Sequence, residues 1–467
     1  NRDIRPILSN HCFACHGPDE HERKGKLRLD TAAGALKGGE TGDTIVAGKP
    51  NDSELIHRIL NADPDEIMPP PKAHKELSKG EKELIRQWIA EGGEYAEPWT
   101  YLPPRRHPVP TVGARDWGEN WIDNFILARL QSENLKPSPD TDPVTLVRRL
   151  HFDLIGLPPT PAEVDQFVKR WKEDPASCLE TTTDALLASP HFGERMAMYW
   201  LDLVRYADTC GYHGDQDHSI SPYRDYVIDA FNDNLPYDDF ITWQLAGDLL
   251  KNPTLEQRVA TGFVRMNPST AEGGAIPDEF QAKNTFDRTE ALGTVLLGMT
   301  LTCARCHTHK YDPIKQVEYY RLYAFFNNTA EGSMDGNKYD YAPVMKAPAD
   351  GAQWREWQEI ENQRDAIIAG AGDILKKNQG EQLPVAEKWQ GSGVKDRLKM
   401  ITDPNGPWQQ TVFFKRATDL LNRISAAEKR FTTTLVAQER KTPRVTKMLR
   451  RGEYNLPFGD SLKPEVP

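Results

Sequence analysis

Cys12-Phe13-Ala14-Cys15-His16 and Cys303-Ala304-Arg305-Cys306-His307 are the two stretches that decide how this chain is organised. Both follow the pattern Cys-x-x-Cys-His, in which two thiols bind one haem c covalently and the next histidine binds its iron. With six Cys and twelve His in 467 residues, chance predicts roughly 0.002 such runs. The pattern therefore predicts two haem c groups. Their attachment residues are Cys12, Cys15, Cys303 and Cys306, and their proximal iron ligands are His16 and His307.

Two other uses of paired cysteines are disfavoured. A Cys₄ zinc site usually has its two halves within about 20 residues, whereas here nearly the whole chain lies between them. A thioredoxin-like dithiol opens a helix after a strand, which neither run does, and it needs no following histidine. Haem attachment is the interpretation that uses every residue of both runs.

Composition argues against a nucleic-acid-binding protein and against a membrane-spanning one. A length of 467 residues with 38% hydrophobic residues predicts two or three domains with real cores. The net charge is −11 and no Lys/Arg block occurs, so we expect no nucleic-acid binding. An acidic face suits a basic redox partner protein. The longest apolar stretch, at 291–301, is too short to span a bilayer, and we expect no transmembrane segment.

Haem c is attached outside the bacterial cytoplasm, so the motifs predict a periplasmic or otherwise extracytoplasmic protein. No signal peptide is present in the sequence, and we expect one to have been removed before Asn1. Cys178 and Cys210 are left over after haem attachment. In an oxidising compartment they either form a disulfide or remain two unpaired thiols, the second being the default.

The pattern along the chain predicts a mainly α fold: a small class-I-like cytochrome c domain, a larger helical haem-bearing domain, and minor β structure near the C-terminus. Capping boxes at Ser78/Glu81 and Thr160/Glu163 mark helix starts. The expected parts are a cytochrome c domain at 1–96, a Pro-rich linker at 97–116, a helical domain with the second motif at 117–330, and a helical segment with a strand-like connector at 331–467.

Strand-like residues occur at 432–438 and 444–449. Unpaired strands need a partner. We therefore expect a C-terminal domain of the same precursor, missing from this chain, to bind there tightly.

The distal ligand of the first haem is predicted to be Met68, in Ile67-Met68-Pro69-Pro70-Pro71. A thioether is a suitable ligand for haem iron, and the proline run stiffens the loop that carries it. His57 and His74 are the alternative ligands. A methionine that only fills the core is the structural alternative.

The sequence indicates the distal ligand of the second haem less clearly. Its distal ligand is predicted to be His213, which lies between Gly211 and Gly214 where the backbone can approach closely. Other possible ligands are His191, His218, Met266 and Met299. If the position is open, the haem becomes a reaction site. Proton transfer there would draw on His309, Glu272, Arg288 and Glu290, although ion pairs on a helix surface also explain these charges.

The sequence resembles a known family. RPIL at 5–8, CHG at 15–17 and IMPP at 67–70 resemble the planctomycete-type cytochrome c domain. The middle of the chain is similar to the domain of unknown function that accompanies it in large secreted proteins. The matching stretches are DLIGLPPT (153–160), SPHFGER (189–195), RYAD (205–208), EGGA (272–275) and CHTHKYDP (306–313). In that family a further C-terminal domain follows a stretch similar to RRGEY at 450–454, but no reaction is implied.

Three function classes follow. The first is an extracytoplasmic di-haem c-type cytochrome that transfers electrons within a larger secreted protein. The second is a haem-dependent oxidoreductase, peroxidase-like or acting on a carbohydrate-related substrate, with haem 2 as reaction centre and haem 1 as electron relay. The third is a carbohydrate-binding or scaffolding protein with vestigial haems. The spin state of ferric haem 2 distinguishes the first two.

Overall fold

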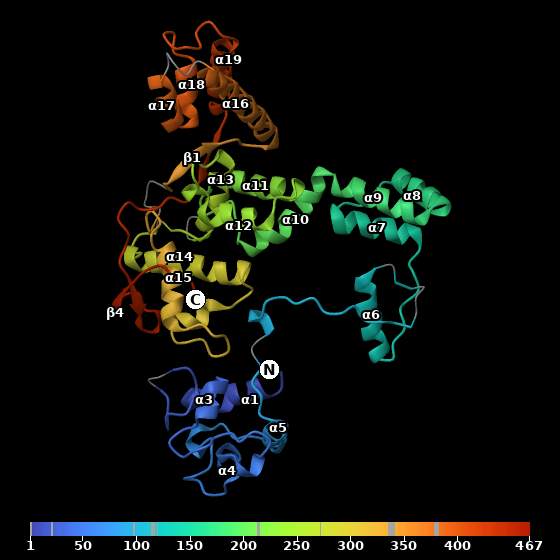
Figure 1. The fold of residues 1–467 in the computed structure, drawn as a ribbon, viewed down its shortest axis with the longest axis vertical. Helices are drawn as coiled ribbons and strands as arrows, with labels where there is room; N and C mark the ends of the chain where they lie inside the picture. The colour runs from blue at the N-terminus through green and yellow to red at the C-terminus, as the bar shows by residue number, and fades with distance from the viewer. Residues whose placement is uncertain are drawn as a thin grey trace. The chain divides into compact units, whose positions relative to one another are not determined.

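The structure is a computed structural model that describes residues 2–19, 22–96, 99–113, 117–118, 120–212, 215–270, 272–334, 341–377 and 383–467. The chain divides into two compact units. The first comprises Asn1–Asp140 with Cys306–Gln316, and the second comprises Thr141–Arg305 with Val317–Pro467. The described residues are mainly helical, with few short strands towards the C-terminus (Figure 1). The prediction of a mainly α fold is confirmed.

The first unit is built around one apolar core. Its α-helices are α1 (Ile4–His11), α2 (Phe13–His16), α3 (Ala32–Lys37), α4 (Glu54–Leu60), α5 (Lys79–Ala90) and α6 (Trp121–Ser132). Leu8, Ile59, Ile85 and Ile89 are among the core residues contributed by α1, α4 and α5. The predicted capping box starts α5, because Ser78 Oγ accepts from the Glu81 amide at 3.2 Å and Glu81 Oε2 accepts from the Ser78 amide at 2.8 Å.

The segment Cys306–Gln316 belongs to the first unit. Lys310 Nζ donates to Asn10 Oδ1 at 3.1 Å, and Arg5 Nη2 donates to the Tyr311 carbonyl at 3.0 Å. Tyr101 donates its hydroxyl hydrogen to Asp312 Oδ1 at 3.1 Å. These contacts hold the residues that follow the second motif against α1, which leads into the first motif.

The second unit begins with α7–α9, which lie side by side in Figure 1 and pack through the buried residues Val147, Phe167 and Cys178. Pro residues at the first helical positions and polar N-caps start these helices. The helices of this unit up to residue 326 are α7 (Pro143–Leu154), α8 (Pro161–Glu173), α9 (Pro175–Leu187), α10 (Pro190–Leu203), α11 (Ser221–Asn232), α12 (Tyr237–Ala246), α13 (Leu255–Ala260), α14 (Pro277–Ala291) and α15 (Gln316–Phe326).

One stretch that resembles the family, SPHFGER at 189–195, lies where α10 packs tightly on α11. A Cβ on Gly193 would lie 2.3 Å from the Ile228 carbonyl oxygen, so only glycine permits this approach. The Gly193 amide donates to Asn232 Oδ1 at 2.8 Å, and Asn232 Nδ2 donates to the Pro190 carbonyl at 3.2 Å. The SPHFGER stretch therefore has a structural role in this helix pair.

A further helical cluster follows, with α16 (Gly351–Lys377), α17 (Leu383–Gly391), α18 (Val394–Ile401) and α19 (Val412–Glu428) around the fully buried Trp408. Short antiparallel strand pairs complete the unit. β1 (Val344–Ala347) pairs with β2 (Thr432–Leu435), with Val344 opposite Leu435 and Ala347 opposite Thr432. β3 (Thr446–Leu449) pairs with β4 (Pro457–Leu462).

The structure confirms strands in the segments predicted near 432–449, namely β2 and β3. Each of them pairs with another strand of this chain, β2 with β1 and β3 with β4. The sequence pattern missed β1 and β4, because four to six residues carry too little alternation to be recognised. The pairing removes unpaired strands as an argument for a tightly bound C-terminal domain.

Cys178 and Cys210 are both buried free thiols. Cys178 lies in the core of α7–α9, with its Sγ 3.5 Å from the Phe167 carbonyl oxygen. The two cysteine side chains form no disulfide in this structure.

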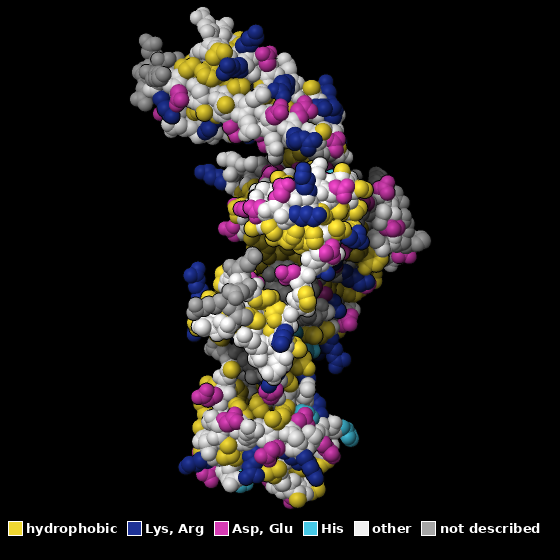
Figure 2. Space-filling model, turned by 90° about the vertical axis from the view of Figure 1, so that its right-hand side faces the viewer, with side chains coloured by type: hydrophobic (Ala, Val, Ile, Leu, Met, Phe, Trp, Pro, Cys, Tyr) yellow, Lys and Arg dark blue, Asp and Glu magenta, His cyan; other side chains and the backbone are white. Residues whose placement is uncertain are grey.

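Among the described residues, no helix has the length and apolar character required to cross a membrane. On the face drawn in Figure 2, acidic and basic side chains alternate over the described surface and do not gather by sign.

Candidate haem sites

A cavity of about 360 Å³ in the first unit brings together residues from both sides of the first motif. Cys12, Cys15 and His16 line it together with Met68, which lies more than fifty residues later in the chain. Large aliphatic residues that line it are Leu27, Leu29, Leu55 and Ile59. An apolar cavity with convergent sulfur and imidazole groups is the kind of site that haem c occupies.

His16 ends α2 and has its ring oriented by a backbone group. Its Nδ1 lies 3.2 Å from the Lys24 carbonyl oxygen. Because a carbonyl only accepts, Nδ1 carries the hydrogen and Nε2 is left as the ligand atom, as is usual for metal-bound histidines. Burial lowers the pKa of His16 despite the hydrogen bond to Lys24, which favours the neutral imidazole that metal binding requires.

The two thiols are held by a helical turn. The Cys15 and His16 amides donate to the Cys12 carbonyl at 3.1 Å and 2.8 Å, so the motif residues form one continuous turn. Cys12 is buried in the core and Cys15 is exposed. Burial, together with the nearby Cys15, raises the pKa of the Cys12 thiol to about 12. Thioether formation would remove this buried ionisable group.

Met68 is half-buried at the cavity, with its amide donating to the Arg58 carbonyl at 3.0 Å. The alternative ligands His57 and His74 are both exposed, and neither is among the residues that line the cavity. The residues around this cavity therefore fit a haem c with imidazole and thioether ligands.

The second motif has a different setting. Cys303 lies in a 3₁₀ turn, Leu301–Arg305, in which Leu301 and Ala304 are buried while Cys303 is exposed. Cys306 and His307 are also exposed. His307 Nδ1 lies 2.8 Å from the Thr308 carbonyl oxygen, which again leaves Nε2 as the ligand atom. Both motifs thus fix the same histidine tautomer, although with different carbonyls.

Two parts of the chain match the models of known protein families. Residues 12–72 match the model of the planctomycete cytochrome C family, and residues 121–331 match that of a protein family of unknown function, DUF1549. The chain combines a planctomycete cytochrome C domain with a DUF1549 domain. The first match implies covalently bound haem c. Searches of curated proteins and of solved structures found no match.

The DUF1549 domain contains the positions considered for the distal ligand of haem 2. His213 lies outside the described residues. His191 Nδ1 is 2.7 Å from Glu194 Oε2 at the start of α10, and Met266 is buried in the core. His218 is buried against Tyr341, with ring centroids 4.8 Å apart. Burial and the nearby Arg265 lower the pKa of His218 to about 4.

Met299, the remaining position considered, is half-buried after α14, and its amide donates to the Gly293 carbonyl at 2.8 Å. Ligation of haem 2 by any of these residues stays a prediction.

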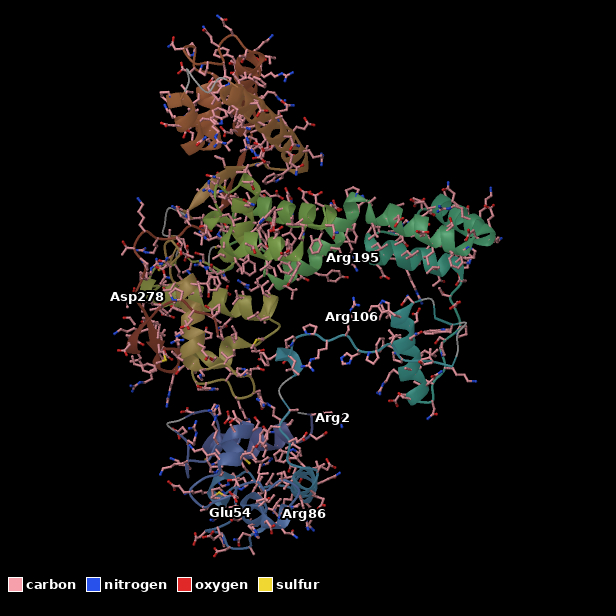
Figure 3. All side chains as sticks on the ribbon, in the orientation of Figure 1. Arg2, Glu54, Arg86, Arg106, Arg195 and Asp278 are labelled. Atoms are coloured by element: carbon pink, nitrogen blue, oxygen red, sulfur yellow. The ribbon has the colours of Figure 1, made fainter. Side chains whose placement is uncertain are left out.

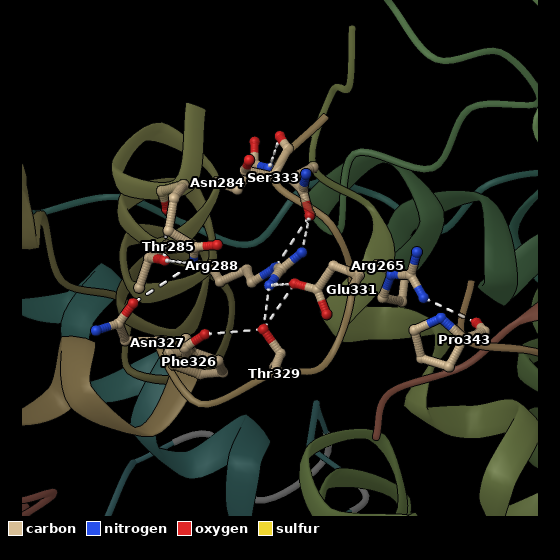
Figure 4. Close-up of polar contacts among 12 residues, drawn as sticks. Arg265, Asn284, Thr285, Arg288, Phe326, Asn327, Thr329, Glu331, Ser333 and Pro343 are labelled. Carbon is tan, nitrogen blue, oxygen red and sulfur yellow. Dashed lines mark hydrogen bonds and ion pairs between the residues drawn. The ribbon is translucent and has the colours of Figure 1, made fainter. Parts of the chain in front are cut away.

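Arg288 in the DUF1549 domain is deeply buried and fully engaged with protein groups (Figure 4). Its Nη1 donates to Glu331 Oε1 and, at 2.8 Å, to Thr329 Oγ1, while Nη2 donates to Asn267 Oδ1 at 2.7 Å. Burial raises the pKa of Glu331, but Arg288, Arg265 and the hydrogen bonds outweigh it and bring this pKa to about 2. The pair therefore stays ionised inside the domain.

The other oxygen of Glu331, Oε2, has no hydrogen-bond partner among the described residues. A cavity of about 20 Å³ lies beside it, which is room for about one water molecule. Arg265 on the other side of this cavity donates to the carbonyls of Tyr341, Pro343 and Val436. The cluster joins segments near residues 267, 329–331, 341–343 and 436.

The remaining proton-transfer candidates each have local partners. His309 is buried, and its Nδ1 accepts from the amides of Tyr311 at 3.2 Å and Asp312 at 2.8 Å, which closes a turn. Glu272 is exposed. Glu290 accepts from the Tyr319 hydroxyl at 3.2 Å. A catalytic role for His309, Glu272 and Arg288 stays a prediction.

The sequence did not indicate that Glu331, Asn267 and Arg58 take part in these polar contacts. Glu331 and Asn267 lie 43 and 21 positions from Arg288, respectively, and no periodic pattern links them. Arg58 carried a detectable signal, since Glu54 precedes it by four residues on a predicted helix, the spacing of an ion pair.

Proposed function

We propose that this chain is an extracytoplasmic di-haem c-type cytochrome that transfers electrons. Haem 1 is held by Cys12, Cys15 and His16 in the planctomycete cytochrome C domain, and haem 2 by Cys303, Cys306 and His307. The observation that carries the proposal is the cavity in which the first motif and Met68 meet.

The chemistry of the first site favours electron transfer. When bound, haem c supplies a one-electron couple. His16 would offer Nε2, because Nδ1 is engaged with the Lys24 carbonyl, and Met68, which lines the same cavity, would offer its sulfur. If His16 and Met68 both bound the iron, the haem would exchange electrons and would not bind peroxide or substrate.

Two observations support the second haem. The second motif is complete, and its histidine has the tautomer that leaves Nε2 for iron. In addition, Lys310 and Tyr311, just after His307, contact Asn10 and Arg5 on α1 within the first unit. Contact between the flanks of both motifs suits electron exchange between their haems.

Location and partner follow from chemistry. Covalent attachment of haem c takes place outside the bacterial cytoplasm, so we place the protein in an extracytoplasmic compartment. Its net charge of −11 favours encounter with a basic redox protein. Raising the ionic strength should slow that encounter.

The test is a redox titration of the matured protein, followed by visible and electron paramagnetic resonance spectra. Electron transfer predicts two one-electron steps, two low-spin ferric haems and no reaction with cyanide or peroxide at modest concentration. His213→Ala should then create high-spin haem 2, and Met68→Ala should do so at haem 1. High-spin haem 2 in the unmodified protein, reacting with peroxide, would instead support the oxidoreductase function.

A further inference from the structure

The loop that carries Met68 is folded by its own polar groups. The Asp63 amide donates to Asn61 Oδ1 at 3.0 Å, and the Asp65 amide donates to Asp63 Oδ1 at 2.9 Å. The Ile67 amide donates to the Asp63 carbonyl at 2.9 Å. These turns shape the loop internally, but they do not attach it to the rest of the domain.

The attachment comes from Arg58 in the last turn of α4. Its carbonyl accepts the Met68 amide at 3.0 Å. Its Nη1 contacts the Glu66 carboxylate and lies 3.4 Å from the Glu66 carbonyl oxygen. Its Nε donates to Glu54 Oε1 at 2.7 Å, which orients the guanidinium along the helix. One residue therefore binds the loop through its backbone and its side chain.

Attachment of the loop by Arg58 matters for a thioether ligand. The methionine sulfur is uncharged. A mobile loop would lose conformational entropy each time this sulfur bound the iron, so a loop that is already held in place favours ligation. The planar guanidinium of Arg58 presents several donors in fixed directions and satisfies Glu54 and Glu66 together. Its side chain is 25% exposed, so solvent screens the pair only in part.

We propose that Arg58 is the positioning residue that holds Met68 at the iron of haem 1. The inference rests on the proposed function, since it assigns a role within the same site. Arg58 does not touch the reacting atoms; it acts through Glu66 and the Met68 backbone.

A different role would be to pair with a haem propionate, because Arg58 also lines the cavity. Glu66 separates the two roles. Glu66→Gln weakens the attachment of the loop but leaves the guanidinium free for a propionate. If Arg58 acts on the loop, Glu66→Gln should reproduce the effect of Arg58→Gln in a weaker form.

The experiment uses the full ferric holoprotein and follows the iron-to-sulfur charge-transfer band and far-ultraviolet circular dichroism during heating. The variants are Arg58→Gln, Arg58→Lys and Glu66→Gln. The control is Arg86→Gln, an exposed arginine on α5 that lies 3.4 Å from Asn51 Oδ1 (Figure 3). The band reports ligation, whereas circular dichroism reports global unfolding.

We expect Arg58→Gln to lose the band well before the helices unfold, with at least a tenfold larger fraction of ferric haem lacking sulfur ligation at moderate temperature. Arg58→Lys and Glu66→Gln should show smaller shifts of the same kind, and Arg86→Gln none. The proposal is overturned if band loss and unfolding coincide in the Arg58 variants as in the parent, or if Glu66→Gln has no effect. Absence of the band in the parent would instead refute Met68 ligation, and with it the first-site part of the proposed function.

Discussion

The two Cys-x-x-Cys-His runs are alike in sequence and different in their surroundings. The first lines a cavity that Met68 also lines, and its Cys12 is buried, whereas Cys303, Cys306 and His307 of the second are exposed. Both histidines have Nδ1 at a backbone carbonyl, so both present Nε2. The two motifs thus share the histidine tautomer, and they differ in how deeply their residues are buried and in the residues around them.

The largest expected effect comes from removing each attachment pair. Cys12→Ser with Cys15→Ser should abolish haem 1 and destabilise the first unit, because Cys12 belongs to its core and the cavity loses its contents. Cys303→Ser with Cys306→Ser should abolish haem 2 with little loss of helix content, because both side chains are exposed. Haem per chain and thermal unfolding of both variants test this. Equal destabilisation would contradict the contrast between the sites.

Met68→His should change the redox behaviour of one haem only. Thioether ligation favours ferrous iron relative to a second imidazole. We therefore expect the potential of haem 1 to fall by on the order of 100 mV, within the range that axial ligands control, and the charge-transfer band to disappear. Potentiometry with optical detection measures both. An unchanged potential and band would mean that Met68 is not the ligand.

The buried ion pair between Arg288 and Glu331 lies in the DUF1549 domain. Glu331→Gln leaves the Arg288 charge uncompensated, which should lower the free energy of unfolding of this domain by about 3 to 5 kcal/mol. The control is Glu194→Gln, whose partner His191 is exposed, with an expected loss below about 1 kcal/mol. Urea unfolding measures both. Equal losses in the two variants would contradict the role of Glu331 in a buried ion pair.

Acidification should weaken the DUF1549 domain gradually. His218 has its pKa lowered from 6.5 to about 4, so between these values the unfolded chain binds a proton that the folded domain does not. Stability therefore falls as the pH drops through this window. Glu331, lowered from 4.5 to about 2, adds a loss at lower pH. The slope per proton is at most about 1.4 kcal/mol per pH unit, and His218→Gln should flatten it between pH 6.5 and 4 in urea unfolding.

Much of the first site could be predicted from sequence because its signals are local. The spacing of Cys12, Cys15 and His16 is a property of one helical turn, and the proline run next to Met68 is visible without a fold. Helix starts at Ser78 and Thr160 were also predictable, since a capping box needs only four residues.

The rest depended on contacts between distant residues. Arg288 and Glu331 look like ordinary surface charges in sequence, because only the fold shows that both are buried. β2 was recognisable, but its partner β1 lies 85 or more positions earlier in the chain and has no pattern of its own. The loop that carries Met68 was predicted, whereas its attachment through Arg58 required the hydrogen bonds to be seen.

We expect this chain to carry two haem c groups, one on each of its two motifs. The most direct measurement is the intact mass under denaturing conditions of protein matured in a host that attaches haem c. The account predicts the mass of the polypeptide plus two haem groups. A single adduct would remove haem from one motif, and a chain with bound zinc and no haem would contradict the account for both.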